Sequence, residues 1–140
     1  MGSHRSRSPE ETEALGAGLA AGLEPGQVVL VEGDLGAGKT TFVRGACRAL
    51  GVSVSVRSPT FSIGHRYPAR VPVAHIDLFR IGDLDGEDPD LLAEYLRPDT
   101  IAFVEWPRHE GRLGALGQIA ARVRIKHAGQ DERRLEIAQR

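Results

Sequence analysis

The chain has 140 residues, a formal net charge of −1, 41% hydrophobic residues and 26% charged residues, which is the composition of a globular domain. These values exclude a mainly disordered chain, a membrane span of about 18 apolar residues, and the strong positive charge that non-specific nucleic-acid binding requires. The single cysteine, Cys47, excludes an internal disulfide and a zinc site made of cysteines.

The first eight residues are polar, and no apolar segment of a signal peptide follows them. We expect residues 1–8 to form a flexible N-terminal segment, with residues 2–4 as a candidate cloning remnant. One domain is predicted over residues 9–140. The absence of an export signal, together with the lone thiol, predicts a cytoplasmic protein.

A helix is predicted to begin at Pro9. Ser8 can cap it, Pro9 suits its first turn, and Glu11 stands three residues after the cap, as in a capping box. Leucines spaced by four form an apolar stripe that carries the helix to about residue 22. Glycines at positions 16, 18 and 22 lower the intrinsic helix preference of this segment.

A strand, a helix and three further strands are predicted next. Residues 28–31 form a short β-branched run, typical of a strand buried on both faces of a sheet. A helix pattern covers residues 39–50, after a glycine-rich stretch. Alternating polarity and turn residues predict strands at residues 52–56, 61–67 and 71–77.

The second half of the chain carries weaker signals. We expect an acidic loop at residues 82–90, then a short helix at residues 91–96. A buried strand is predicted at residues 101–104 and a weak helix at residues 113–121.

Two alternating runs near the C-terminus, residues 123–127 and 135–138, flank the turn sequence GQD at residues 129–131. This arrangement predicts a β-hairpin.

Residues 33–40, GDLGAGKT, match the phosphate-loop pattern G-x-x-x-x-G-K-[ST] without a mismatch. In such a loop, backbone N–H groups and the positive end of the following helix surround phosphate oxygens. Lys39 would neutralise the β- and γ-phosphates, and Thr40 would place its hydroxyl on Mg²⁺. A glycine-rich turn that binds nothing is the alternative. The predicted strand before the loop and the predicted helix after it favour nucleotide binding.

Two acids, Asp77 and Glu105, end predicted strands. Ligands of open α/β sheets bind at the carboxyl ends of the strands, so each acid faces the phosphate site if its strand lies beside the loop strand. The alternative for either acid is an ordinary polar residue where a strand meets a loop. Two such acids together with the phosphate loop favour a catalytic or metal-binding role.

Four segments together resemble one protein family. They are GDLGAGKTT at residues 33–41, SPTF at 58–61, HIDLFR at 75–80 and the pair Glu105-Trp106. In this order the chain is similar, over about residues 8–138, to the TsaE (YjeE) family of bacterial ATPases. Members of that family are needed for N6-threonylcarbamoyladenosine (t6A) in tRNA. Phe79 stands where the family usually has tyrosine.

The resemblance implies an α/β fold: one P-loop NTPase domain with three layers, α/β/α, around a mixed, mostly parallel sheet. It implies that ATP is bound with Mg²⁺ and hydrolysed to ADP while the chain is docked on the TsaB–TsaD heterodimer, resetting the TsaD transferase between turnovers. Contact with tRNA would be indirect, through that complex, and no membrane would be involved.

The resemblance also assigns roles to single residues. Catalytic roles fall on Lys39, Thr60, Asp77 and Glu105, and metal binding on Thr40, Thr60, Asp77 and Glu105. Which of Asp77 and Glu105 touches Mg²⁺ directly stays open. The candidate nucleotide-contacting residues are Thr12, Gly33, Asp34, Leu35, Gly36, Ala37, Gly38, Lys39, Thr40, Thr41 and Trp106.

Several of these residues have simpler interpretations. Trp106 can be a packing residue at the rim of the site, and Thr60 can begin a strand. His75 alternates with Asp77 and therefore points to the same face of its strand. It either orients Asp77 or a switch loop, or is a structural histidine with satisfied hydrogen bonds.

Two other functions compete with a tRNA-modification ATPase. A stand-alone small-molecule or nucleotide kinase needs an acceptor pocket and a lid, and 140 residues leave little chain for both. A nucleotide-dependent binding module without meaningful turnover overlaps the first hypothesis, because isolated P-loop proteins often hydrolyse slowly until a partner completes the site.

Overall fold

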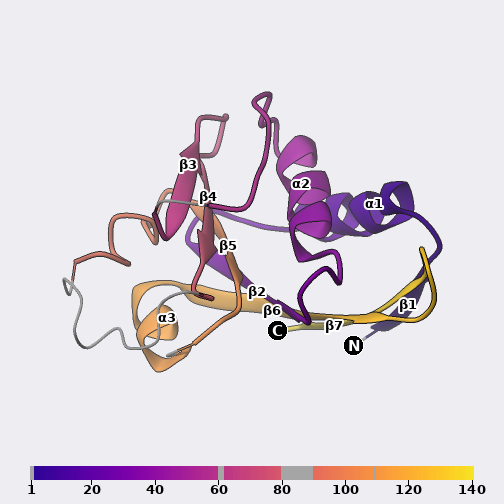
Figure 1. Cartoon of the computed structure of the whole chain (residues 1–140). Coiled ribbons are helices and arrows are strands. Elements are labelled where there is room, and N and C mark those ends of the chain that lie inside the picture. Colours follow the sequence, from indigo (N-terminus) through magenta and orange to yellow (C-terminus); the bar gives the residue numbers. More distant parts are fainter. Residues whose placement is uncertain (1, 60–61, 80–89, 109) are drawn as a thin grey trace.

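A computed structural model describes residues 2–59, 62–79, 90–108 and 110–140. Along the chain the elements are β1 (Gly2–Ser6), α1 (Pro9–Ala20), β2 (Gln27–Gly33), α2 (Lys39–Ala49), β3 (Gly64–Tyr67), β4 (Val73–Asp77), β5 (Ile101–Glu105), α3 (Glu110–Leu116), β6 (Gln118–His127) and β7 (Arg133–Gln139) (Figure 1). No helix within the described part of the chain is long and apolar enough to cross a membrane.

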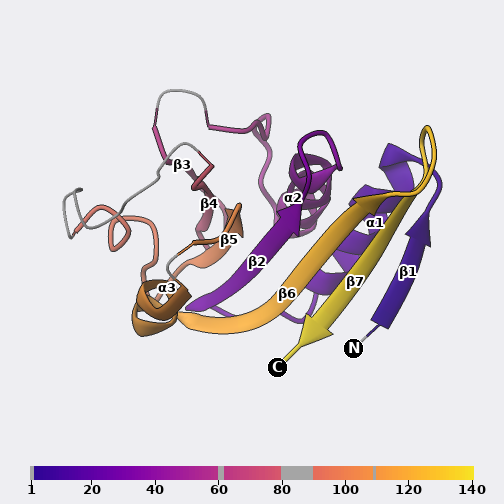
Figure 2. The same ribbon diagram turned by 60° about the horizontal axis from the view of Figure 1, so that its bottom comes forward.

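The strands form one seven-stranded sheet in the order β1-β7-β6-β2-β5-β4-β3 (Figure 2). The pairs β2–β5, β2–β6 and β4–β5 are parallel, and the other three pairs are antiparallel. Five strands therefore run in one direction, and only β7 and β3 run against them. The predicted α/β class with a mixed, mostly parallel sheet is confirmed.

Each face of the sheet buries its own apolar cluster, because strand side chains alternate between the two faces. Val29, Val31 and Phe103 pack with α1 and α2 on one face. Leu30 and Val104 pack on the other face, where α3 and the turns at residues 91–96 supply the cover (Figure 1). The central strands are thus buried on both sides, as the apolar run in β2 predicted.

Helices α1 and α2 approach each other closely through glycine. A Cβ atom on Gly16 would lie 2.2 Å from the carbonyl oxygen of Phe42, and one on Gly45 would lie 2.0 Å from that of Glu13. The Ser8 side chain caps α1 by accepting a hydrogen bond from the N–H of Glu11. The glycines that weaken α1 by propensity are therefore explained in part by its packing against α2.

The N-terminal segment differs from the prediction. Residues 1–8 were expected to be flexible, whereas Gly2–Ser6 forms edge strand β1, antiparallel to β7. Ser6 is fully buried, and its hydroxyl lies 2.6 Å from that of Thr12 in α1. The polar composition of this segment gave no strand signal, because an edge strand gains its stability from backbone pairing as well as from apolar burial.

Two predicted elements are absent from the described structure. Residues 52–56 form no strand, although Val52 and Val56 are buried in the cluster under α2 and Val54 is exposed. This extended segment packs without a strand partner, so its alternation was misleading. Residues 91–96 form turns instead of a helix, with Leu92 and Leu96 buried against the sheet.

Other predicted elements are present with different boundaries. The helix expected at residues 113–121 is α3, which ends at Leu116, and β6 already begins at Gln118. The strand expected at residues 61–67 is present over Gly64–Tyr67, and Phe61 lies outside the described residues. Most of the acidic loop, residues 82–89, lies outside them too. The C-terminal hairpin is confirmed as β6 and β7.

Candidate functional site

The glycine-rich loop joins the end of β2 to the start of α2, as predicted. Gly36 and Gly38 have φ angles of 77° and 107°, in the left-handed region that favours glycine. Gly38 also caps α2, and its carbonyl accepts the N–H of Phe42 at 3.0 Å. The loop therefore directs the N-terminal end of a helix, where backbone N–H groups lack helical partners, toward one site.

Lys39 begins α2 and is 5% exposed. Its Nζ donates hydrogen bonds to the carbonyls of Gly33 at 2.7 Å and Asp34 at 2.8 Å, and it lies 4.0 Å from the centre of the Trp106 ring. Burial lowers the pKa of Lys39 from its usual value of 10.5, while the negative charges of Glu105, Asp77 and Asp34 oppose that shift. The structure thus holds this cation inside the loop.

Glu105 ends β5, the strand next to β2, and is 2% exposed. The hydroxyl of Thr40 donates to its two carboxylate oxygens at 3.0 and 3.2 Å, across 65 residues of sequence. A second contact joins Glu105 Oε2 to His75 Nε2. The buried carboxylate is therefore tied to the first turn of α2 and to β4.

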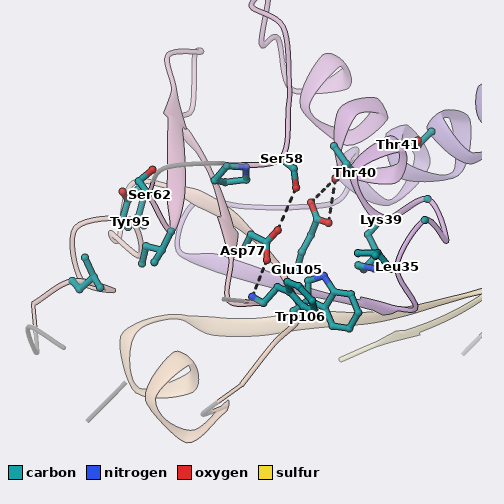
Figure 3. A pocket seen from close by; sticks show the side chains of 16 residues that line it. Leu35, Lys39, Thr40, Thr41, Ser58, Ser62, Asp77, Tyr95, Glu105 and Trp106 are labelled. Atoms are coloured by element: carbon teal, nitrogen blue, oxygen red, sulfur yellow. Dashed lines mark hydrogen bonds between the residues drawn. The ribbon is translucent and has the colours of Figure 1, made fainter. Parts of the chain in front are cut away.

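Asp77 ends β4 and is the register partner of Glu105. Its side chain is more exposed and contacts loop residues: Oδ2 accepts the hydroxyl of Ser58 at 3.2 Å, and Oδ1 accepts the N–H of Phe79 at 2.9 Å. Figure 3 shows the two carboxylates side by side, with Thr40 on one side and Trp106 on the other.

These groups line a cleft of about 920 Å³. Phe79 and Trp106 form one wall, with ring centres 4.7 Å apart, and Trp106 has an unusual φ of 54° for a bulky residue. The predicted residues that line the cleft are Leu35, Gly36, Gly38, Lys39, Thr40, Thr41, Asp77, Glu105 and Trp106. Their convergence from β2, α2, β4 and β5 is a geometry that the motif alone does not contain.

Four predicted residues lie elsewhere. Gly33 and Asp34 line a neighbouring cavity of about 300 Å³, on which Trp106 also borders, and Ala37 is fully buried. Thr12 lines a small hollow of about 50 Å³ on another side of the loop, with Gly38 and Thr41. Thr60 lies outside the described residues, so its role stays a prediction.

Sequence reasoning missed some contacts. His75 contacts Glu105, and among the described residues it makes no hydrogen bond to Asp77, one of its two expected targets. Arg133 of β7 donates from Nε to the carbonyl of Ala37 at 3.0 Å, so the C-terminal hairpin braces the phosphate loop. Tyr95 lines the cleft from the turn segment. Strand register and hairpin position create these contacts, and no local motif marks them.

The donor set suits a hard divalent cation. The Thr40 hydroxyl and the carboxylates of Glu105 and Asp77 are oxygen ligands of the kind that Mg²⁺ prefers. No group of three or more His, Cys, Asp and Glu side chains that could hold a metal occurs among the described residues. Mg²⁺ does not need one, because one or two carboxylates together with phosphates and water normally complete its shell.

A glycine-rich loop between a buried strand and a helix, with two carboxylates at the ends of adjacent parallel strands, defines a class of mixed-sheet α/β domains. Within this class, residues 6–135 match the family model described as threonylcarbamoyl adenosine biosynthesis protein TsaE. The chain belongs to the TsaE family, as the sequence motifs indicated.

Individual relatives agree. The chain is 42% identical over 133 residues to the Bacillus subtilis tRNA threonylcarbamoyladenosine biosynthesis protein TsaE, covering 94% of this chain and 81% of the relative. It is 41% identical over 118 residues to the Streptomyces coelicolor protein of the same name, covering 81% and 78%. A crystal structure of Bacillus subtilis YdiB superposes with a TM-score of 0.74 at 34% identity, covering 98% of this chain and 84% of that one.

Proposed function

We propose that this chain binds ATP with Mg²⁺ and hydrolyses it during t6A biosynthesis, acting on the TsaB–TsaD heterodimer to reset the transferase. The hydrogen bonds between Thr40 and Glu105 carry this proposal. They join the loop threonine to the acid of the adjacent strand, which is the pair that holds Mg²⁺ in P-loop NTPases.

The loop supplies the phosphate site. Lys39 exchanges its bonds to the carbonyls of Gly33 and Asp34 for bonds to phosphate oxygens, so a cation already held in place meets the anion. The free N–H groups at the start of α2 add donors and the positive end of the helix dipole. Both contributions favour a triphosphate over an uncharged ligand.

Thr40 and Glu105 hold the metal, with Asp77 beside them. Bound Mg²⁺ supplies neutralisation of the phosphate charge that develops during transfer. Asp77 lines the same cleft and is more exposed than Glu105, so we assign it the contact with the attacking water. Trp106, whose ring lies against Lys39, belongs to the proposed set, and the family resemblance adds Thr60 with a role near the γ-phosphate.

Dependence on partners is part of the proposal. The relatives are named as tRNA threonylcarbamoyladenosine biosynthesis proteins, and we assign this chain to the same process, in the cytoplasm. The cleft is bordered by two exposed apolar side chains, Leu35 at 73% and Phe79 at 45% exposure. A partner that covers these side chains would shield the cleft from water and complete the site.

The test measures ATP hydrolysis by the purified chain alone, and then with TsaB, TsaD and tRNA, together with t6A formation over several turnovers. We expect weak hydrolysis alone and multiple-turnover modification only when the chain and ATP are both present. The Lys39→Ala variant in the same mixture serves as the control. Rapid phosphorylation of a small acceptor by the isolated chain would instead support a kinase, and unchanged modification without the chain would refute the proposal.

A further inference from the structure

His75 is a fully buried histidine in the middle of β4, the strand next to the edge strand β3. Its Nε2 contacts the Oε2 atom of Glu105, and its Nδ1 has no hydrogen-bond partner among the described residues. Buried polar atoms usually have a partner, so this unpaired nitrogen calls for a physical account.

The hydrogen-bonding chemistry of the pair accounts for it. An ionised carboxylate only accepts hydrogen bonds, so the contact with Glu105 places a proton on Nε2. In the neutral ring Nδ1 is then an acceptor, and a buried acceptor without a partner is less costly than a buried N–H without one. The surroundings therefore select one tautomer, the one whose single donor points at Glu105.

The Nε2–H donor of His75 restrains the carboxylate of Glu105. Among the described residues, Glu105 Oε2 accepts from His75 and from Thr40, and Oε1 accepts from Thr40. The carboxylate is thereby held between β4 and α2, and its rotation is restricted. Within the part of the chain that the structure describes, the hydrogen bonds of Asp77 come from Ser58 and from the backbone of Phe79, both in loop segments.

We propose that His75 is a positioning residue for the metal site: its Nε2–H holds Glu105 so that the remaining lone pairs of that carboxylate face the Thr40 hydroxyl. This inference rests on the proposed function, because it assumes that Glu105 and Thr40 hold Mg²⁺. Residues that orient metal ligands in this way typically change metal affinity or activity by about 10- to 100-fold when they are replaced.

Two amide variants separate positioning from packing. In His75→Gln the side-chain amide nitrogen stands about where Nε2 does and can donate to Glu105. In His75→Asn the amide is one bond shorter and cannot reach. His75→Leu replaces the ring with an apolar side chain of similar size that has no hydrogen-bond donor. His65→Asn is the control, because His65 is the register partner of His75 on β3, and among the described residues it makes no hydrogen bond to Glu105.

The primary readout is nucleotide binding rather than turnover. Trp106 is the sole tryptophan and lies beside Lys39 and Glu105, so its fluorescence reports occupancy of the cleft by a non-hydrolysable ATP analogue. Titrations at increasing Mg²⁺ give the Mg²⁺ concentration at half-maximal effect for each variant. Steady-state kcat and KM for ATP, measured with TsaB and TsaD, and thermal unfolding complete the set.

We expect His75→Asn and His75→Leu to raise the Mg²⁺ midpoint about 10-fold and to lower kcat by at least as much, with KM for ATP changed less than about 2-fold. His75→Gln should stay within about 3-fold of the unmodified chain, and so should His65→Asn. Rescue by glutamine at equal thermal stability identifies the donor as the cause.

The inference is overturned if folded Asn and Leu variants keep the original Mg²⁺ midpoint, or if Gln is as impaired as they are. If one of Asn and Leu does not fold, the other is compared with Gln. If neither folds, a Gln variant that folds and keeps the midpoint supports the inference, and one that loses it refutes it. An unmodified chain that shows no Mg²⁺-dependent binding would refute the proposed function itself, a result separable from all of these.

Discussion

Asp77 and Glu105 occupy equivalent places at the ends of neighbouring parallel strands, yet their surroundings differ. Glu105 is 2% exposed and is held by side chains from β4 and α2, two packed elements. Asp77 is partly exposed and is held by Ser58 and the backbone of Phe79, both in loop segments. Equal positions in the sheet therefore hold one buried carboxylate bonded to two packed elements and one partly exposed carboxylate bonded to loop segments.

This difference suggests a division of labour. A buried carboxylate with several donors suits the fixed geometry of a metal site, because its position does not change when ligand arrives. A more exposed carboxylate on loops can exchange its hydrogen bonds when substrate binds. Substitutions in and around the two acids should therefore differ in the size of their effects.

The largest effect is expected at Lys39, which lines the same cleft as both acids. Lys39→Ala removes a buried cation from the phosphate site and should weaken ATP binding by about 100-fold or more, equivalent to about 3 kcal/mol. Isothermal titration with a non-hydrolysable analogue measures the affinity. Lys126→Ala, which removes the other lysine, is the control. Unchanged affinity in Lys39→Ala would show that the loop does not bind phosphate.

Glu105→Ala should lower the rate of ATP hydrolysis by about 100-fold while changing nucleotide affinity by less than about 10-fold. The reason is that the carboxylate acts on the metal and the developing charge, whereas the loop N–H groups and Lys39 supply most of the binding. Single-turnover hydrolysis and equilibrium binding are measured on the same preparation. Full activity in this variant would remove Glu105 from the site.

Asp77→Asn keeps the shape of the side chain and an acceptor for the N–H of Phe79, and it removes the charge. We expect hydrolysis to fall by about 10-fold, less than for Glu105→Ala, with the Mg²⁺ dependence nearly unchanged. A larger loss than in the Glu105 variant, accompanied by a shifted Mg²⁺ midpoint, would reverse the proposed roles of the two acids.

The pKa of Lys39 reports how strongly the charge of each acid acts on this lysine. Burial lowers its pKa, and Glu105 opposes that shift more strongly than Asp77 does. Glu105→Gln should therefore lower the pKa of Lys39 further than Asp77→Asn does. Side-chain NMR in a Lys126→Arg background, where Lys39 is the sole lysine, measures both values. Equal shifts would mean that the two carboxylates act on the loop alike.

The lowered pKa of Lys39 also makes the free energy of unfolding depend on pH. Between the folded-state pKa of Lys39 and its usual value of 10.5, the folded chain binds fewer protons than the unfolded chain. The contribution of Lys39 to the free energy of unfolding therefore increases with pH across that window and is least favourable below it. Urea unfolding at a series of pH values should show a steeper rise for the original chain than for Lys39→Met.

The smallest effect is expected at Ser58. Ser58→Ala removes the exposed hydrogen bond from the Ser58 hydroxyl to Asp77 Oδ2. Such a bond contributes about 0.5 kcal/mol, so the rate of ATP hydrolysis should change by about 2-fold. Steady-state ATP hydrolysis with TsaB and TsaD is the measurement. A 10-fold loss would mean that Asp77 depends on its neighbour as much as Glu105 is proposed to depend on His75.

The sequence predicted those parts of the molecule in which local pattern and final structure coincide. The loop at residues 33–40 is contiguous, so its residues could be listed before any fold was known, and Ser8 and Pro9 marked the start of α1 correctly. Asp77 and Glu105 were found because each ends an apolar strand. The family resemblance rested on these same segments, and it was confirmed.

The rest depends on register and packing. His75 meets Glu105 because β4 and β5 are aligned so that Asp77 pairs with Glu105, and Arg133 reaches Ala37 because the hairpin lies beside the loop. No local sequence pattern predicts either alignment. Residues 52–56 show the reverse case, since their alternation arises from packing under α2 without a strand partner.

The place of β2 in the sheet has a consequence for the order of assembly during synthesis. The phosphate loop is made early, but its strand pairs only with β5 and β6, both of which are translated after β3 and β4. Until the ribosome has released β6, the loop strand lacks one of its two neighbours, and such non-local pairing slows folding. The strand that precedes the loop therefore completes its pairing only after β6, late in the chain, has been made.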